Sequence, residues 1–140
     1  MKKIRAKAVC LFRYNGKVLL AEGYDPVKDE HFLMPIGGGV DFGETSEAAA
    51  KREVKEEINA VAVELNLLGV SENIFSFNGK QGHEIVFVYE GHFDDDSLYQ
   101  RDVIHGIESN GDEITLRWFD LTYLQSGQRN VYPDGIKKML

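Results

Sequence analysis

Residues 37–60 read GGGVDFGETSEAAAKREVKEEINA, and this stretch contains the clearest helix signal in the chain. Thr45 or Ser46 is a suitable N-cap, because a short oxygen-bearing side chain can accept a hydrogen bond from the first free backbone N–H groups. Asn59 stands where a left-handed residue commonly follows the end of a helix. The pattern therefore predicts a helix over residues 45–58.

Three glutamates of this helix share one side of it. At about 100° per residue, Glu53, Glu56 and Glu57 fall within a single arc of the helix surface. The apolar residues that we expect to pack against a sheet lie on the adjacent arc: Ala50, Val54 and Ile58. Carboxylates this close repel one another, and a bound cation would relieve the repulsion. Oxygen ligands favour Mg²⁺ or Mn²⁺, which also bind the oxygens of a substrate phosphate.

Three consecutive glycines, Gly37, Gly38 and Gly39, precede the helix, and we expect them to form a loop. A glycine backbone can approach a ligand closely, and the loop leads into the positive N-terminus of a helix, which suits an anion. The loop lacks the lysine and the hydroxyl residue of a P-loop. Glu44 adds a carboxylate near Arg52. We therefore expect the glycines and Glu44 to contribute to substrate binding.

Over residues 38–60 the chain resembles the Nudix box. The box is G-x5-E-x7-R-E-U-x-E-E-x-G-U, with U aliphatic, and this sequence has Gly38-x5-Glu44-x7-Arg52-Glu53-Val54-x-Glu56-Glu57-x-Asn59-Ala60. Every charged residue of the box is present in this sequence. Asn59 replaces the final glycine, and both residue types accept a left-handed backbone. Ala60 replaces the last aliphatic residue, which bears on packing more than on chemistry.

The resemblance implies a Nudix-type α/β/α sandwich that hydrolyses the diphosphate of a nucleoside diphosphate linked to a group X. The products would be a nucleoside monophosphate and a second fragment that carries phosphate. The resemblance also implies that Glu53, Glu56 and Glu57 bind Mg²⁺ (or Mn²⁺) and that one of them orients or deprotonates the attacking water. Arg52 would hold the glutamates by charge-assisted hydrogen bonds. A carbonyl of the triple glycine would be a further ligand.

Enzymes of this family often take one more carboxylate from outside the box. The candidates in this sequence are Glu84, Glu108, Asp112 and Glu113. We favour Glu113 as the additional metal ligand because it directly precedes the last predicted strand. Each of the four also fits a simple surface charge.

The rest of the chain alternates between strand patterns and turns, without repeats or linkers. Strands are expected at residues 4–14, 17–21, 31–34, 60–70, 84–93 and 114–119, and short helices at residues 121–125 and 134–140. Turns are expected at Asn15-Gly16 and at residues 78–82. Polar loops are expected at residues 23–30 and 94–113, and the second is long enough to suggest a binding loop. Together these elements predict one α/β domain over residues 1–140, with a mixed central sheet between helices.

The composition restricts the partners. A net charge of −7 argues against binding a nucleic-acid polymer, which usually needs a basic stripe. A small nucleotide substrate remains compatible, since a bound metal reverses the local field. No stretch is apolar for long enough to span a membrane, and the first residues do not resemble a secretory signal. Cys10 is the only cysteine, so a reducing cytoplasm is the expected setting. The sequence leaves a homodimer open.

Two functions of different classes fit these features. The first is the hydrolase, and the second is a nucleotide-binding sensor or regulator that kept the fold and lost turnover. The intact pairs Arg52-Glu53 and Glu56-Glu57 favour the hydrolase, because a binding module needs no such clustered charge. A structural Ca²⁺ domain is excluded by the missing Asp/Asn loop pattern.

The sequence leaves the substrate open. Residues 74–77 lack the proline that the ADP-ribose group of the family tends to place there. No tyrosine lies between Ala60 and Gly82, where the dinucleoside-polyphosphate group favours one. These absences slightly favour a nucleoside triphosphate. Several aromatic residues are suitable for stacking on a base, and the sequence does not choose among them: Tyr24, Phe32, Phe42 and Tyr132.

Overall fold

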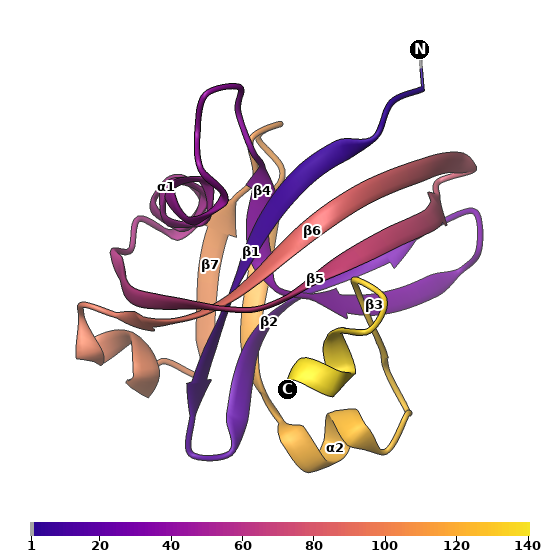
Figure 1. Cartoon of the computed structure of the whole chain (residues 1–140). Helices are drawn as coiled ribbons and strands as arrows, with labels where there is room; N and C mark the ends of the chain where they lie inside the picture. Colours follow the sequence, from indigo (N-terminus) through magenta and orange to yellow (C-terminus); the bar gives the residue numbers. More distant parts are fainter. Residues whose placement is uncertain (1) are drawn as a thin grey trace.

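A mixed sheet with helices on both of its faces forms the protein (Figure 1). The computed structural model describes residues 2–140. Its elements, in chain order, are β1 (Arg5–Tyr14), β2 (Lys17–Asp25), β3 (Glu30–Met34), β4 (Ile36–Gly39), α1 (Ser46–Ile58), β5 (Ala62–Phe77), β6 (Lys80–Phe93), the 3-10 helix η1 (Asp96–Gln100), β7 (Val103–Ile107), β8 (Glu113–Asp120), α2 (Leu121–Gln125), β9 (Asn130–Val131) and the 3-10 helix η2 (Ile136–Met139).

β1 is the central strand because three other strands pair with it. It runs antiparallel to β4 and to the start of β2, and parallel to β6, which in turn carries β5. β2 continues the sheet through antiparallel pairs with β3 and β8, and β7 pairs with β8. β9 adds a short parallel pair with β3. The mixed central sheet expected from the sequence is therefore confirmed.

Two tight turns set the register of the sheet. Asn15 and Gly16 both have positive φ (51° and 74°), as a two-residue hairpin turn requires, and Tyr14 pairs with Lys17 across them. Asn78 and Gly79 form the same kind of turn between β5 and β6 (φ 52° and 78°). This hairpin is longer than expected from the sequence, because the two-residue turn lets the strands pair directly up to it.

Two predicted loops are wrong. Only residues 26–29 of the loop expected at 23–30 lie outside strands, since β2 continues to Asp25 and β3 begins at Glu30. Residues 94–113 contain η1 and β7, so they do not form one long binding loop. β7 is only five residues long, and the polar residues around it obscured its apolar pattern. Ile104 of β7 is nevertheless buried, which is the reason that this segment forms a strand.

The two faces of β1 lead to two separate cores. Cys10 and Phe12 point to the face that α1 covers, where they join Val54 of the helix. Leu11 lies on the opposite face, in a cluster that includes Leu124 of α2 and Ile136 of η2. Full burial of such a side chain stabilises the fold by about 1.5–3 kcal/mol. This alternation with a period of two confirms the α/β/α sandwich.

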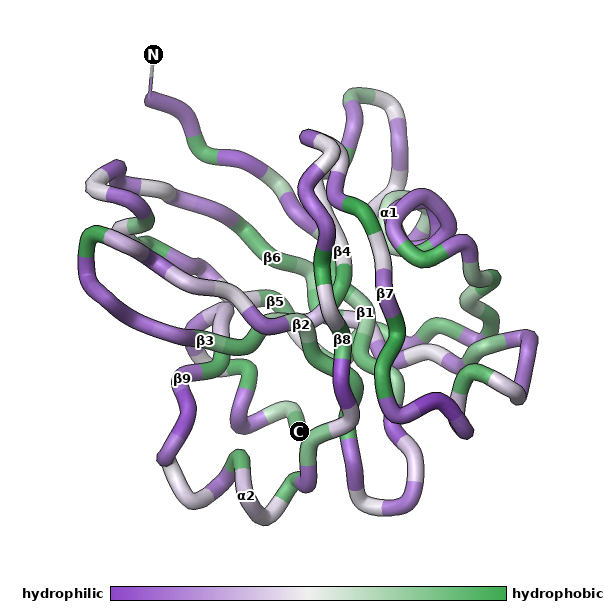
Figure 2. The backbone as a smooth tube through the Cα atoms, turned by 180° about the vertical axis from the view of Figure 1, so that it is seen from behind, coloured by the Kyte–Doolittle hydropathy of each residue, from purple (hydrophilic) through white to green (hydrophobic). Residues whose placement is uncertain are grey.

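Hydrophobic residues are concentrated along the central strands, whereas the turns that connect the strands are mostly hydrophilic (Figure 2). Within residues 2–140 there is no helix of the length and apolarity that a membrane crossing needs.

The predicted helix is confirmed, and Thr45 is its N-cap. The Thr45 hydroxyl accepts the backbone N–H of Ala48 at 3.1 Å. Ser46, the other candidate, is the first helical residue, and its hydroxyl bonds the hydroxyl of Tyr89 at 2.6 Å. Asn59 follows the helix in the left-handed conformation (φ 53°). The helix therefore begins and ends as the sequence predicts, which fixes the rotation of its glutamates.

Candidate active site

The triple glycine forms β4 and not the loop that we expected. Gly37, Gly38 and Gly39 pair with Val9, Ala8 and Lys7 of β1. Glycine is needed there because α1 packs closely onto the strand. A Cβ on Gly38 would stand 2.6 Å from each carboxylate oxygen of Glu53, a distance that side chains do not tolerate. The glycines thus let a carboxylate lie directly against the strand backbone.

Arg52 organises the acidic residues around the start of α1. Its guanidinium donates to both carboxylate oxygens of Glu44, at 2.8 and 2.9 Å, and to the carbonyl of Gly39 at 2.9 Å. It also donates to Glu53 at 2.9 Å and to Glu56 at 3.2 Å. A bidentate pair of this kind fixes the orientation of both partners. The Arg52 side chain therefore links the β4–α1 connection, through Gly39 and Glu44, to Glu53 and Glu56 of the helix.

The same contacts explain the charge of Glu44. Hydrogen bonds from Arg52, followed by the backbone N–H of Asp41, lower the pKa of Glu44 to about 2. The hydrogen bond to Glu44 is also the main reason that the pKa of Arg52 is raised. Because both Glu44 oxygens are engaged by Arg52, this carboxylate holds the arginine in place.

Glu53 and Glu57 lie within hydrogen-bonding reach of each other. Glu53 is buried, with 8% of its surface exposed. Burial, followed by the hydrogen bond and charge of Glu53 and the charge of Glu108, raises the pKa of Glu57 to about 8, whereas the charge of Lys7 opposes the rise. Metal-free Glu57 therefore keeps its proton near neutral pH.

Glu108 is the carboxylate from outside the motif that the structure brings to Glu57. It follows β7, and Gly106 of that strand packs against the end of α1, where a Cβ would come within 2.5 Å of the Glu57 carbonyl oxygen. Burial, followed by the charge of Asp112, raises the pKa of Glu108. We call Glu53, Glu57 and Glu108 the carboxylate cluster. Glu108 was among the sequence candidates, but only β7, which the sequence did not reveal, explains its position.

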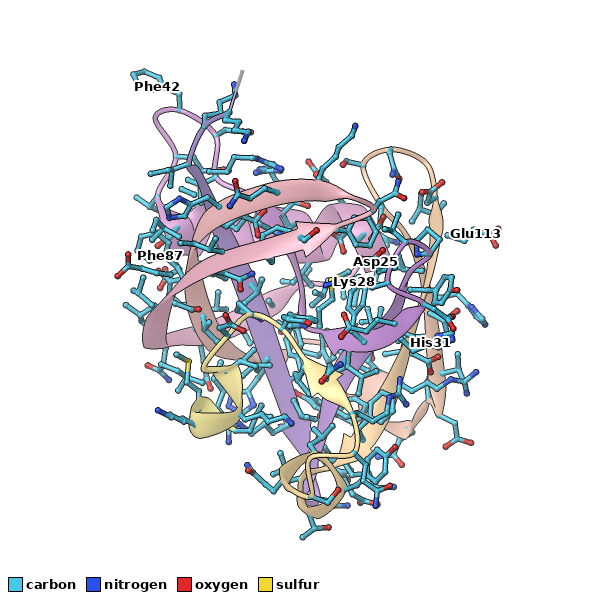
Figure 3. The ribbon with its side chains drawn as sticks, turned by 90° about the vertical axis from the view of Figure 1, so that its right-hand side faces the viewer. Asp25, Lys28, His31, Phe42, Phe87 and Glu113 are labelled. Carbon is cyan, nitrogen blue, oxygen red and sulfur yellow. The ribbon has the colours of Figure 1, made fainter. Side chains whose placement is uncertain are left out.

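Glu113, the favoured candidate, lies elsewhere. It is the exposed first residue of β8, opposite Ile107. Ile114 and Leu116 of the same strand face the core under α1, so the alternation of the strand turns Glu113 to the other side. Its side chain points outward in Figure 3. Glu56 lies at the edge of the cluster, about half exposed and held by Arg52.

The donor set fits a divalent cation of the Mg²⁺ type. All of its groups are carboxylate oxygens, and a cation could take the place of the proton that Glu57 holds. As the side chains stand, no three His, Cys, Asp or Glu residues in the described part of the chain are close enough together to hold a metal. Arg52 engages oxygens of Glu53 and Glu56, and these oxygens would have to turn towards a bound metal.

A cavity of about 450 Å³ lies beside the carboxylate cluster. Its near end is lined by Lys7, Glu84 and Glu108, and Lys7 lies 3.8 Å from Glu84. Its far end, which we call the aromatic end, is lined by Phe32, Phe75, Phe77 and Tyr132. The flat rings lie together at the far end, where Glu30 accepts a hydrogen bond from Tyr132 and where Asp25 and Lys28 also line the cavity. Such a cavity can bind an elongated molecule with a phosphate group and an aromatic group.

Comparisons with known proteins give the family. The family model described as NUDIX domain matches residues 2–137. Among solved structures, the MutT NUDIX hydrolase from Burkholderia pseudomallei has 27% identity and a TM-score of 0.64, covering 86% of each chain. The NUDIX hydrolase from Nitrosomonas europaea has 18% identity and a TM-score of 0.69, covering 98% of this chain and 86% of that one. A structure described as an ADP compounds hydrolase has 16% identity and a TM-score of 0.60, covering 89% of this chain and 62% of that one. The similarities to the last two structures concern the fold alone.

Because the family model spans nearly the whole sequence, the chain belongs to the Nudix family and is a pyrophosphohydrolase of the Nudix type.

Proposed function

We propose that this enzyme hydrolyses the diphosphate of a nucleoside diphosphate linked to X with the help of Mg²⁺ or Mn²⁺. The products are a nucleoside monophosphate and a fragment that carries phosphate. The observation that carries the proposal is the carboxylate cluster of Glu53, Glu57 and Glu108, which adjoins the end of the cavity that Lys7 lines. Glu57 holds a proton near neutral pH in the metal-free protein, and such a carboxylate is suited to a cation that replaces the proton.

The roles of the residues follow from their contacts. Glu53 and Glu57 are the principal metal ligands, with Glu56 and Glu108 at the edges of the same site. A bound Mg²⁺ would supply positive charge that activates water and neutralises charge on the phosphate oxygens. Glu57 is our candidate for orienting or deprotonating that water, because burial and the neighbouring carboxylates raise its pKa to about 8, within the range of a general base.

Arg52 and Glu44 are positioning residues in this scheme. Arg52 holds Glu53 and Glu56 by hydrogen bonds, and Glu44 fixes Arg52 in turn. The backbone of Gly37, Gly38 and Gly39 is our candidate for contacting the substrate phosphates, because Gly38 lies directly against Glu53 of the proposed metal site. We propose Glu108 in place of Glu113 as the ligand from outside the motif.

The substrate is a small nucleotide, and a nucleoside triphosphate is our first choice. Arg5 and Lys7 line the cavity at its polar end and can pair with phosphate oxygens. The relatives support a nucleotide in general terms, since one is described as a MutT hydrolase and another as an ADP compounds hydrolase. A cytoplasmic setting and a homodimer remain predictions of the sequence.

The test is a panel of nucleotides assayed for phosphate and nucleoside monophosphate release. The panel contains triphosphates, ADP-ribose, sugar nucleotides and dinucleoside polyphosphates, each with Mg²⁺, with Mn²⁺ and with a chelator. We expect at least one substrate to be cleaved with metal and none with chelator. Glu57→Gln should lower kcat by about 10²- to 10⁴-fold. Glu47→Gln is the matched control, because Glu47 is an exposed glutamate of the same helix that pairs only with Lys51 at 3.9 Å.

The proposal fails if cleavage persists in chelator, or if Glu57→Gln retains the activity of the wild type in saturating Mg²⁺. A folded protein that turns over nothing in the panel would also contradict it. The far-UV circular dichroism and Tm of each variant verify that the fold is intact.

A further inference from the structure

Two buried polar residues of β5 hold the backbone of one distant residue. Ser71 and Asn73 are 6% and 5% exposed. The Ser71 hydroxyl donates to the carbonyl of Asp134 at 2.6 Å, and the backbone N–H of Asp134 donates to Oδ1 of Asn73 at 3.3 Å. Both main-chain groups of Asp134 therefore have a side-chain partner on β5. We call Ser71 and Asn73 the clasp.

The clasp joins the two ends of the sheet. The strand order is β5-β6-β1-β2-β3-β9, so β5 and β9 end the path. Residues 130–134, which we call the strap, begin as β9 beside β3, where the N–H of Tyr132 donates to the carbonyl of Leu33 at 2.9 Å. Figure 1 shows this C-terminal segment, in yellow, crossing from β3 towards β5. The strap and the clasp therefore close the open path of strands into a ring.

The ring encloses the aromatic end of the cavity. Tyr132 and Pro133 of the strap line the cavity. Because side chains alternate along a strand, the clasp shares one face of β5 with Phe75 and Phe77, which also line it. The ring of Tyr132 meets that of Phe32 edge to face at 5.6 Å. A looser strap would therefore move one aromatic wall away from the others.

Hydrogen bonds suit the positioning of a cavity wall better than apolar contacts do. Burial of a hydroxyl or an amide costs free energy unless the group is bonded, so apolar residues are the ordinary choice on a buried strand face. Hydrogen bonds are directional, and buried polar groups that are bonded fix one arrangement of the chain. The clasp therefore sets the position of the strap more narrowly than packing alone.

We propose that Ser71 and Asn73 are positioning residues that increase the affinity for the base of the nucleotide, because they hold Tyr132 at the wall of the aromatic end. The inference rests on the proposed function, since it takes the base of the substrate to lie at this end. Ser71 is not among the residues that line the cavity, so its effect on the base passes through the strap. Arg5 and Lys7, which line the polar end, belong to β1, which the clasp does not contact. The clasp should therefore act on the base and not on the phosphate.

Binding of nucleoside monophosphates tests the inference without any need for turnover. Titration calorimetry in Mg²⁺ would compare AMP, GMP, CMP and UMP with ribose 5-phosphate, which has the sugar and the phosphate but no base. None of these ligands contains a diphosphate. The variants are Ser71→Ala and the double variant Ser71→Ala/Asn73→Ala. Ser126→Ala is the matched control, because the Ser126 hydroxyl also donates to a backbone carbonyl, that of Tyr123, but is exposed and outside the cavity lining.

We expect the wild type to bind at least one monophosphate about 10-fold more tightly than ribose 5-phosphate, as stacking of the base on aromatic walls would give. Ser71→Ala should weaken that binding by roughly 3- to 10-fold, and the double variant should weaken it further. The affinity for ribose 5-phosphate should not change, and Ser126→Ala should bind every ligand like the wild type. A general loss of structure would weaken both kinds of ligand alike.

Amide hydrogen exchange of the free protein measures the strap directly. The N–H of Asp134 should exchange faster in Ser71→Ala, although its own hydrogen bond to Asn73 is retained. If both clasp variants fail to fold, Tyr132→Phe loosens the strap at its β3 end, because it keeps the ring and loses the hydrogen bond to Glu30 at 3.2 Å. The same selective loss of monophosphate binding is then expected.

The inference is overturned if Asp134 exchanges faster in Ser71→Ala while monophosphate binding is undiminished, or if its exchange does not change at all. An equal loss of affinity for ribose 5-phosphate would contradict it too, as would a wild type that binds no monophosphate more tightly than ribose 5-phosphate. Failure of the proposed function gives a different result. In that case no nucleotide is cleaved in the panel, while the tighter binding of monophosphates still depends on the clasp.

Discussion

The two ends of the cavity are built in different ways. The carboxylate cluster takes two of its three members from one turn of α1, Glu53 and Glu57, and a neighbouring arginine holds the first of these. The aromatic end is assembled from β3, from the β5–β6 hairpin and from the segment after β9, which are far apart in the sequence. The first end is fixed by the period of a helix, whereas the second exists only in the folded protein. We infer that the rate of the reaction depends on the first end and the choice of substrate on the second.

This division predicts that substitutions at the two ends change different kinetic constants. A change at the helix should lower kcat with little effect on base preference. A change at the aromatic end should raise KM with little effect on kcat. A variant that changes kcat and KM by the same factor would weaken this distinction between the two ends of the cavity.

The largest effect is expected for Arg52→Met. It leaves Glu44 and the buried Glu53 without their main partner, so we expect the Tm to fall. We expect kcat to fall by about 10²-fold or more, because the glutamates lose their orientation. Thermal unfolding and steady-state kinetics measure the two effects. Lys51→Met is the control, since Lys51 makes only an exposed pair with Glu47, and it should change neither quantity appreciably.

A second effect concerns the pH dependence of the metal-free protein. The pKa of Glu57 is about 8 in the fold and returns to its ordinary value near 4.5 on unfolding. The folded state therefore binds the proton more tightly, so the free energy of unfolding should fall as the pH rises from about 4.5 through about 8. Urea denaturation in chelator at several pH values measures this slope. Glu57→Gln should flatten it, and an unchanged slope in that variant would show that another group is responsible.

The smallest effect is expected at the aromatic end. Phe32→Leu removes the ring that meets Phe77 and Tyr132, and we expect KM to rise roughly 10-fold with kcat nearly constant. Phe87→Leu is the control, because Phe87 is partly buried against the core on the α1 side of the sheet and is not among the residues that line the cavity. Both variants should lose similar stability. A rise in KM for Phe87→Leu as large as for Phe32→Leu would remove the aromatic end from substrate recognition.

The sequence predicted the helical part of the site well, for a physical reason. Capping residues and the period of the helix are local, so Thr45, Asn59 and the shared arc of the glutamates could be derived from spacing alone. The resemblance to the Nudix box added the family, which the family model confirms. That these glutamates are the metal ligands stays a prediction, as does a single domain over residues 1–140.

The rest of the site depends on contacts between distant segments. Glu113 was favoured because it directly precedes the last predicted strand. The position of Glu108 depends on β7, which was taken for part of a loop and which pairs with β8. Asp25 was placed in a polar loop, whereas it is a buried residue at the end of β2. The triple glycine was also expected to be a loop, since nothing in its local sequence reveals that α1 will pack against it.

The most direct test of the carboxylate cluster is a Mn²⁺ titration followed by electron paramagnetic resonance. It would compare the wild type with Glu57→Gln, Glu108→Gln and Glu113→Gln in the absence of nucleotide. We predict that the first two variants weaken Mn²⁺ binding by about 10-fold or more and that Glu113→Gln binds like the wild type. Wild-type affinity in Glu57→Gln, or a loss confined to Glu113→Gln, would contradict the assignment of the metal to the cluster of Glu53, Glu57 and Glu108.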